Sequence, residues 1–203
     1  MRYWIIASLA LSAFACNNSE PPQKALPIIG NHDIQGKDTI YHQIPDFAFI
    51  DQDSQVVTNA TFDGKIYVAD FFFTSCPTIC PKVKKQMLRI YDKYKDEPRL
   101  MFLSHSIDPK RDTVGRLKTY SENLGVDTER WRFVTGNKDE IYEIADDYMS
   151  IALEDPTAPG GFDHSGWILL IDKDRHIRSY CNGTVPEKVD EFMKDVDWLL
   201  GHM

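Results

Sequence analysis

Two patterns of apolar residues alternate along the chain from about residue 44 onward. Residues 65–73 form an almost continuous apolar run rich in β-branched and aromatic side chains, which predicts a central strand covered on both faces. Residues 81–94 carry apolar side chains at helical spacing, which predicts a helix. The same two patterns predict further elements on either side of this pair. Strands are expected over 47–50, 55–58, 99–106, 131–135, 167–171 and 176–181, and helices over 112–124, 137–149 and 186–200.

The order of these elements predicts an α/β fold. Alternating strands and helices indicate βαβ units, and the closing strand, strand and helix add an antiparallel edge. This is the order of a thioredoxin-like fold, to which the chain adds an N-terminal hairpin and one extra helix. One domain over residues 44–203 is long enough to hold them. With 42% hydrophobic residues, that domain can bury a core without the help of disulfides.

The start of the chain has the features of an export signal. A short positive region precedes residues 3–15, which are mostly apolar or small over a length too short to span a bilayer. The segment Ala13-Phe14-Ala15-Cys16 resembles a bacterial lipobox. We therefore expect residues 1–15 to be a signal peptide, Cys16 to carry lipid and residues 16–43 to be a lipid-anchored linker. The alternative is a cleaved secretory signal in which the cysteine is incidental. Both interpretations place the domain outside the cytoplasm, and the first makes it a membrane-anchored lipoprotein facing the periplasm.

Charge and cysteine content narrow the function classes. The formal net charge of −8 argues against binding to nucleic acid, because phosphate backbones require clustered Lys and Arg. The four cysteines are Cys16, Cys76, Cys80 and Cys181. If the first carries lipid, three remain, and an odd number argues against a purely structural disulfide framework. The close pair Cys76 and Cys80 is therefore the candidate for metal or redox chemistry.

The two cysteines of this pair lie in the segment FTSCPTICP, between a buried strand and a helix. Pro81 suits the first position of a helix, because it lacks an N–H group. A cysteine at a helix start is favoured as the thiolate, the form that binds metals and attacks disulfides. The spacing of four residues lets both sulfurs reach one ion, and it also permits a disulfide between them. A C-x-x-C pair would indicate a dithiol oxidoreductase more directly.

His164 is the candidate for a third ligand. It precedes the strand expected over 167–171, and in a thioredoxin-like fold this loop lies beside the cysteine turn. Two thiolates and one imidazole form a soft site that suits Cu(I) and accepts Cu(II), with Zn(II) as a chemical alternative. Asp163 is expected to orient the imidazole as a hydrogen-bond acceptor. The alternative is that His164 is a loop histidine with no ligand role.

Three segments resemble the Sco/SenC family, in the same order and with fitting spacing. They are the C-x-x-x-C-P motif at 76–81, the segment SIDPKRDT at 106–113, and DHS at 163–165 followed by LLID at 169–172. The resemblance extends over the whole domain, from about residue 44 to 200. The resemblance implies a copper site formed by Cys76, Cys80 and His164. It also implies delivery of copper to the binuclear copper centre of cytochrome c oxidase, or reduction of the cysteines of that centre.

The resemblance also suggests roles for two acidic residues. Asp108 matches a family acidic position near the site, and the alternative is that it shapes the turn before Pro109. Asp112 is expected to be the N-cap of the following helix. The chain departs from the family at Thr78, where Asp is common, and at Ser75, where His is frequent. Both departures remove charge near the site, so the resemblance leaves the copper affinity and the redox potential open.

Three functions are compatible with these residues. The first is a copper metallochaperone whose partner is the copper-accepting subunit of cytochrome c oxidase or another cuproprotein. The second is an extracytoplasmic thiol–disulfide reductase in which Cys76 and Cys80 form the redox-active pair, and the third is a copper or redox sensor. His164 favours the first function, because a dithiol reductase does not need a third ligand.

Overall fold

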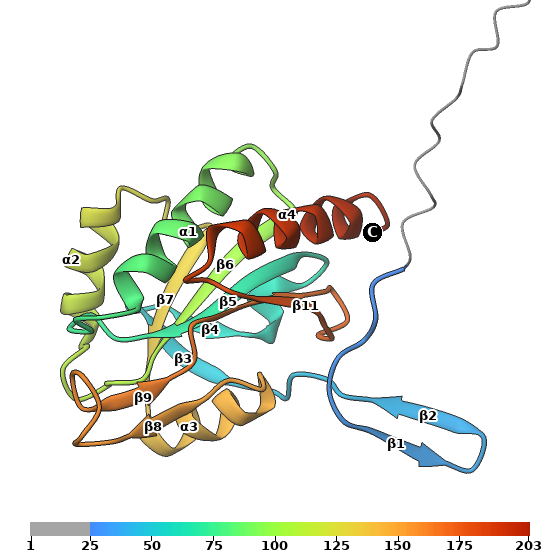
Figure 1. Cartoon of the computed structure of the whole chain (residues 1–203), viewed down its shortest axis with the longest axis horizontal. Coiled ribbons are helices and arrows are strands. Elements are labelled where there is room, and N and C mark those ends of the chain that lie inside the picture. The colour runs from blue at the N-terminus through green and yellow to red at the C-terminus, as the bar shows by residue number, and fades with distance from the viewer. Residues whose placement is uncertain (1–24) are drawn as a thin grey trace, which may run out of the picture.

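The centre of the molecule is a seven-stranded sheet (Figure 1). The computed structural model describes residues 25–203. The strand order is β11-β10-β5-β6-β7-β3-β4. The central strands β5, β6 and β7 run parallel, and the strands on either side pair antiparallel. The strands are β3 (Ala48–Asp51), β4 (Val56–Thr58), β5 (Ile66–Phe72), β6 (Leu100–Ser106), β7 (Trp131–Thr135), β10 (Trp167–Ile171) and β11 (Ile177–Asn182), with a short 3-10 helix at Asn59–Phe62.

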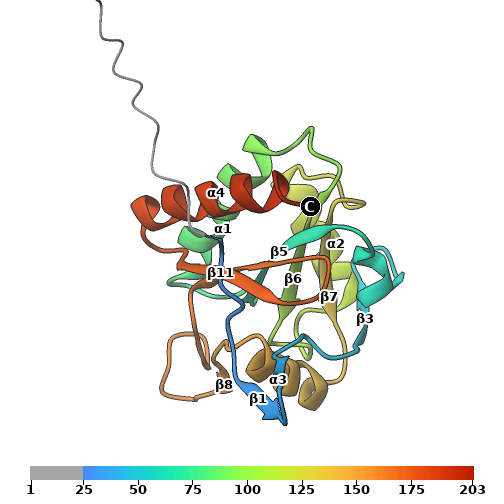
Figure 2. The ribbon, with the colours of Figure 1, turned by 90° about the vertical axis from the view of Figure 1, so that its right-hand side faces the viewer.

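Helices cover both faces of this sheet (Figures 1 and 2). Three helices pack on one face, and α3 packs on the other. The first face holds the contact of Tyr120 with Phe72, and on the second face Tyr148, at the end of α3, packs on Phe71. The layers confirm the predicted α/β, thioredoxin-like fold with its N-terminal hairpin of β3 and β4. The helices are α1 (Cys80–Lys93), α2 (Val114–Leu124), α3 (Lys138–Asp147) and α4 (Pro186–Leu200).

The central strands are buried along their whole length, which explains their nearly continuous apolar runs. All seven residues of β5 and all seven of β6 are buried. Because β5 and β6 are parallel, the segments that follow them leave the sheet at the same end, where both strands have their C-termini. The cysteine turn follows β5, and the SIDPKRDT segment begins at the end of β6. Two of the three segments on which the family resemblance rests therefore lie side by side at the C-terminal end of these strands.

The start of α2 corrects one prediction. The helix begins at Val114, and its N-cap is Thr113, whose side chain accepts a hydrogen bond from the Arg116 N–H. The expectation that Asp112 is the N-cap is therefore wrong. Its side chain is fully buried and bonds instead to Thr74 and Ser106.

A small hairpin was missed between α3 and β10. Strand β8 (Ala152–Glu154) pairs antiparallel with β9 (Phe162–His164), and both lie outside the main sheet. Each has only three residues, too few for an alternating pattern to emerge. The segment that joins them is rich in Pro and Gly, which indicates a loop. His164 therefore lies at the end of a strand rather than in an open loop.

Part of the segment expected to be a linker contacts the domain. The backbones of Ile29 and Ile177 form an isolated antiparallel bridge. Arg178 of β11 donates hydrogen bonds to the carbonyl groups of Leu26 and Pro27. A two-stranded hairpin then follows with all its side chains exposed, formed by β1 (His32–Gln35) and β2 (Asp38–Tyr41). The expected signal peptide and Cys16 lie outside the described residues.

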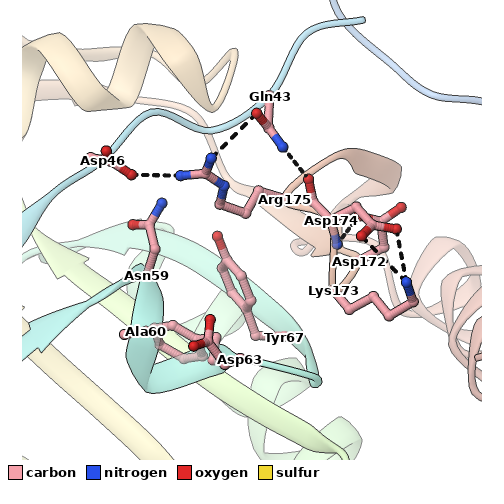
Figure 3. Close-up of a pocket in the computed structure, with 11 residues that line it drawn as sticks. Gln43, Asp46, Asn59, Ala60, Asp63, Tyr67, Asp172, Lys173, Asp174 and Arg175 are labelled. Atoms are coloured by element: carbon pink, nitrogen blue, oxygen red, sulfur yellow. Dashed lines mark hydrogen bonds and ion pairs between the residues drawn. The ribbon is translucent and has the colours of Figure 1, made fainter.

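Arg175 fastens the chain just before β3 to the turn between β10 and β11. Its guanidinium binds Asp46 at 2.6 Å and the Gln43 side-chain oxygen at 3.3 Å, and the Gln43 amide donates to the Asp174 carbonyl (Figure 3). These residues line a polar cavity of about 400 Å³ that Tyr67 also borders. Tyr67 is near the start of β5, so this cavity lies at the end of the sheet opposite the cysteine turn.

Candidate metal centre

The cysteine turn is built where the buried strand β5 passes into α1. The Cys76 N–H donates to the Phe73 carbonyl, which closes a turn directly after the strand. Cys80 is the first residue of α1, and Pro81 follows it in the first helical turn. The Cys80 N–H donates to the Cys76 sulfur at 3.4 Å. One of the otherwise unpaired N–H groups of a helix start is therefore used to hold the first cysteine.

The structure brings His164 to both sulfurs. The distance from its Nε2 atom is 3.1 Å to the Cys80 Sγ and 3.8 Å to the Cys76 Sγ. One ligand atom from each of the three residues lies within 4.8 Å of the others. Thiolate and imidazole ligands bind a metal such as zinc at about 2.0–2.3 Å, so ligand atoms of one ion lie at most about 4.6 Å apart. The three side chains are therefore close to the arrangement in which they could share one ion.

The β8–β9 hairpin places the imidazole. His164 pairs with Ala152 across the hairpin, and the Phe73 ring meets the imidazole edge-on at 5.2 Å. At the hairpin tip, Gly160 has a φ of +83° and approaches the cysteine turn closely. A Cβ atom there would lie 2.8 Å from the Phe73 ring and 3.2 Å from Pro77. Only glycine fits this contact without displacing its neighbours.

Burial keeps the imidazole in the neutral form. It lowers the pKa of His164, and this effect outweighs the charges of Asp163 and Asp70, which raise the pKa. A neutral imidazole is the form that binds a metal. Asp163 is exposed, and among the described residues no hydrogen bond joins its carboxylate to His164. Its influence on the imidazole is therefore electrostatic, in place of the hydrogen bond that we expected.

The two cysteines differ in acidity. Burial raises the pKa of Cys76, but hydrogen bonds from the backbone N–H groups of Thr78 and Cys80 outweigh burial, and the net pKa is lowered. Burial raises the pKa of Cys80 strongly, and Cys76 raises it further, whereas the positive charge of Lys84 lowers it. Cys76 is therefore the thiol that ionises first, and Cys80 keeps its proton until a ligand or a base removes it.

A buried ion pair that was not predicted from the sequence lies beneath the dithiol. The Lys84 ammonium of α1 lies 3.0 Å from the Asp70 carboxylate of β5, with side chains 4% and 1% exposed. Ser104 bonds to both, and the Trp131 indole donates to Ser104. Two signals pointed to this pair: an acidic residue inside the apolar run of β5, and a lysine next to the apolar stripe of α1.

Asp112 holds the cysteine turn against the neighbouring strand. Its carboxylate accepts hydrogen bonds from the Thr74 N–H at 2.9 Å, from the Thr74 hydroxyl at 2.5 Å and from the Ser106 hydroxyl at 2.7 Å. Thr74 lies two residues before Cys76, so the contact fixes the start of the turn. Arg116 of α2 adds a hydrogen bond from its Nε to the Thr74 hydroxyl.

Asp108 and Cys181 lie outside the three-residue group. The Asp108 carboxylate is buried and accepts hydrogen bonds from the backbone and the guanidinium of Arg111. These contacts fit the alternative role, that of shaping the turn around Pro109. Cys181 is buried in β11, and burial raises its pKa to about 12. Within residues 25–203, the group of Cys76, Cys80 and His164 is the one cluster of three or more metal-binding side chains.

None of the helices in the described part of the chain combines the length and the hydropathy needed to cross a bilayer.

Several known proteins are similar to this chain in sequence. The SCO1 protein homolog of Bacillus subtilis (strain 168) is 29% identical over 164 residues, which cover 80% of this chain and 85% of that protein.

Solved structures extend the comparison. A SCO1/SenC family lipoprotein from Bacillus anthracis aligns with a TM-score of 0.71 and 26% identity, over 78% of this chain and 95% of that one. BsSco, described as a member of the Sco family of cytochrome c oxidase assembly proteins, aligns with a TM-score of 0.67 and 29% identity, over 77% and 92%. Copper-bound ScoI of Bradyrhizobium japonicum aligns with a TM-score of 0.59 and 27% identity, over 74% and 97%. The SCO1/SenC family model matches residues 36–201, and the chain therefore belongs to the SCO1/SenC family.

Proposed function

We propose that this chain is a copper metallochaperone. It binds one copper ion through Cys76, Cys80 and His164 and passes it to a copper-accepting subunit of cytochrome c oxidase, for its binuclear copper centre, or to another cuproprotein. The observation that carries the proposal is the convergence of three soft ligand atoms within 4.8 Å. They come from two segments that are 84 residues apart in the chain, Cys80 and His164.

The chemistry of these three side chains fits copper as cargo. Two thiolates and a neutral imidazole favour Cu(I), which accepts low coordination numbers and soft ligands. Cys76 ionises first, and Cys80 releases its proton when the ion binds, so copper uptake becomes tighter as the pH rises. On delivery, each Cu–S bond to this chain is exchanged for a Cu–S bond to the partner. The copper remains Cu(I), and protons from the partner's thiols return to the two cysteines.

Related proteins support the choice of copper and of the partner. ScoI of Bradyrhizobium japonicum has been solved with copper bound, and BsSco is described as a member of a family of cytochrome c oxidase assembly proteins. The chain shares 27% and 29% of its residues with these two proteins over at least 74% of its length. The same donor atoms could also hold Zn(II), so the metal has to be tested directly.

We also propose that the domain is exported and held at the membrane. Residues 1–15 act as a signal peptide, Cys16 carries the lipid, residues 16–43 connect the lipid to the domain over 44–203, and the site faces the periplasm. The description of the Bacillus anthracis relative as a lipoprotein supports this assignment. Lipid labelling of the expressed chain tests it: the parent incorporates labelled fatty acid, and Cys16→Ala does not and leaves the membrane fraction.

Copper titration of the reduced, purified chain tests the metal site. The parent is expected to bind one Cu(I) per chain in competition with a chromophoric Cu(I) chelator. Cys76→Ala and His164→Ala should bind at least about tenfold more weakly, because each removes one ligand from a three-ligand site. Cys181→Ala and His176→Ala are matched controls outside the cluster and should bind as the parent does. Parent-like affinity in His164→Ala would refute the three-ligand site.

The difference in acidity between the two cysteines favours a second candidate function, thiol–disulfide exchange. The Cys76 thiolate would attack a disulfide of the partner, and Cys80 would then displace the mixed disulfide. The partner gains two electrons, and the chain ends with a Cys76–Cys80 disulfide. Insulin reduction distinguishes this role from the first: a reductase turns insulin over at rates like those of thioredoxin without stable copper, and a metallochaperone does not.

A further inference from the structure

A groove between α1 and α2 leads to the two sulfurs from the side of the molecule that carries these helices. Its volume is about 310 Å³, and Cys76 and Cys80 both border it. His164 is not among its lining residues, since the β8–β9 hairpin brings that side chain from elsewhere. Ligand pockets usually measure roughly 300–1,000 Å³, so the groove has room for a short chain segment rather than for a large ligand.

The walls of the groove are mostly apolar. Phe73 forms part of it next to the cysteine turn, Leu88 lines it from α1, and Tyr120 and Leu124 line it from α2. Leu88, Tyr120 and Leu124 are half-buried, so each keeps apolar surface that a ligand can cover. Apolar clefts with an aromatic side chain at the centre are typical of the sites where one protein anchors a side chain of another.

Two polar groups of the groove have no partner in the described part of the chain. The Tyr120 ring packs on Phe72 and Phe133, but its hydroxyl makes no hydrogen bond within residues 25–203. Lys85 lines the groove with an exposed side chain, and none of the ion pairs found in residues 25–203 involves it. A donor hydroxyl and an unneutralised ammonium therefore face whatever enters.

Two exposed cations lie on or beside the groove, although the chain as a whole carries a formal net charge of −8. Lys85 lines the groove from α1, and Arg116 adjoins the groove because its Nε bonds to the lining residue Thr74. The Arg116 side chain is 48% exposed, and its Nε also lies 3.6 Å from the buried Asp112 carboxylate, so its guanidinium is shared between Asp112 and the rim of the groove. A cationic rim on an acidic protein favours an anionic partner and steers its approach.

We propose that this groove receives an extended segment of the copper-accepting partner, one that carries its cysteine between apolar and acidic side chains. The inference rests on the proposed function, because copper can pass between thiolates only when the partner's sulfur comes within bonding distance of Cys76 and Cys80. The apolar walls bind the neighbours of that cysteine, the Tyr120 hydroxyl donates to a backbone carbonyl, and Lys85 and Arg116 pair with the acidic residues. Charge complementarity thus selects the segment, and the groove aims its sulfur at the dithiol.

The test measures docking without copper. In a background of Cys16→Ser, Cys80→Ser and Cys181→Ser, Cys76 is the one remaining thiol. The probes are two synthetic peptides whose central cysteine is joined to 5-thio-2-nitrobenzoate by a disulfide. Both have Leu beside the cysteine, and their outer positions are Glu in one and Lys in the other. Cys76 attacks the peptide sulfur, the new disulfide forms, the coloured thionitrobenzoate leaves, and the Cys76 proton goes to the buffer.

The acidic peptide is expected to react at least about threefold faster than the basic one at low salt, and the ratio should fall toward one at about 0.5 M salt. Lys85→Glu should invert the preference. Lys82→Glu makes the same charge change on α1 outside the groove lining and should leave the preference within about twofold of the parent. Rates with neutral 2,2′-dithiodipyridine correct each variant for changes in the reactivity of Cys76 itself.

The apolar walls are tested in the same assay. The double variant Leu88→Ala, Leu124→Ala should slow both peptides by a similar factor and leave the neutral reagent unaffected. Leu153→Ala, which removes an exposed leucine from the β8–β9 hairpin, is the matched control and should change neither rate. Equal effects of Lys82→Glu and Lys85→Glu, or equal rates of the two peptides with the parent, would refute the proposal that the groove binds an acidic segment.

The copper titration separates this inference from the proposed function. Lys85→Glu retains Cys76, Cys80 and His164 and is expected to bind one Cu(I), as the parent does. A chain that selects the acidic peptide but binds no copper would retain the groove and refute the metallochaperone. A chain that binds copper but shows no preference would refute the groove alone.

Discussion

The two faces of the central sheet treat buried polar side chains in opposite ways. On the face under α1, Lys84 and Asp70 form an ion pair that Ser104 completes with two further hydrogen bonds. His105, the residue after Ser104 in β6, lies on the face toward α3. It is 0% exposed, and neither of its ring nitrogens has a hydrogen-bond partner within residues 25–203. Its imidazole stacks on Phe71 and meets Tyr148 and other aromatic rings.

The buried polar groups of the two faces differ in their charge and in whether they influence the cysteines. A buried ion pair is weak support for stability, because the cost of desolvating two charges can exceed their attraction. The pair nevertheless lies next to the dithiol: Lys84 borders the groove of the cysteines and lowers the pKa of Cys80. His105 contributes no charge, since burial lowers its pKa to about 3. One face therefore supplies fixed charges to the site, and the other supplies a neutral aromatic core.

Breaking the ion pair should have the largest effect on stability. Lys84→Met leaves the Asp70 carboxylate buried without its cation, and we expect it to lower the free energy of unfolding by about 3–5 kcal/mol. Chemical denaturation of the reduced chain measures the loss. The double variant Asp70→Leu, Lys84→Met removes both charges and should recover most of it. If the single variant cost less than about 1 kcal/mol, solvent would have to reach Asp70, and the contrast between the faces would fail.

The neutral histidine should make stability depend on pH. The pKa of His105 is about 3 in the folded chain and about 6.5 when unfolded, so between these values the unfolded state alone binds the proton. The stability contribution is complete above about pH 6.5 and falls by about 1.4 kcal/mol per pH unit below about pH 6. His105→Phe keeps a buried ring without a proton site. The difference between parent and variant in urea unfolding from pH 7 to 5 isolates this term, and parallel curves would contradict it.

A third substitution tests whether the face with fixed charges also holds the cysteine turn. Asp112→Asn removes the negative charge and one of the two acceptor oxygens. One carboxylate oxygen accepts from the Thr74 N–H and the Ser106 hydroxyl and the other accepts from the Thr74 hydroxyl, and an amide NH2 group in either place cannot accept. We expect a loss of about 1–2 kcal/mol in unfolding free energy. The turn should also loosen, so the variant should bind Cu(I) more weakly than the parent. Asp108→Asn, a buried carboxylate outside the cysteine turn, is the control and should keep the parent's copper affinity.

The smallest expected effect concerns which of the two cysteines is alkylated first. Because the pKa of Cys76 is lowered and that of Cys80 is raised, iodoacetamide should modify Cys76 first. The Cys76 rate should approach its plateau at a lower pH than that of a free cysteine. Mass spectrometry of quenched samples between pH 6 and 10 measures both rates. The double variant Asp70→Leu, Lys84→Met should slow Cys80 further, because it removes the charge that lowers the Cys80 pKa.

Much of the fold was predictable because the central strands are buried on both faces and the helices on one. Every strand of the main sheet and all four helices of the described residues were expected close to their observed bounds. The β8–β9 hairpin was not, because three-residue strands show no period and the Pro- and Gly-rich segment between them has the composition of a loop. The contacts of residues 26–29 with β11 were not predicted either, since residues 26–29 contribute only backbone groups to them, and backbone groups carry no sequence signal.

Some residues of the candidate site were predictable from the sequence, and others were not. Cys76 and Cys80 were evident from local spacing and from the helix that follows them. Placing His164 beside them depended on the family resemblance and on the expected topology, since no local pattern links residues so far apart. The role of Asp112 was misassigned, because a carboxylate next to a helix start resembles an N-cap in sequence. Its true partners, Thr74 and Ser106, are brought near only when the two parallel strands pair.

The separation of His164 from the cysteines bears on how the site forms during folding. The dithiol is made by a turn of five residues, whereas the imidazole arrives from 84 residues beyond Cys80. Contacts between distant parts of a chain form slowly, because a long loop has to close before they stabilise anything. A partly folded chain therefore offers two sulfurs and no imidazole. The complete set of three side chains exists only once the C-terminal half has folded, so under the proposed function high-affinity copper loading would report that folding is finished.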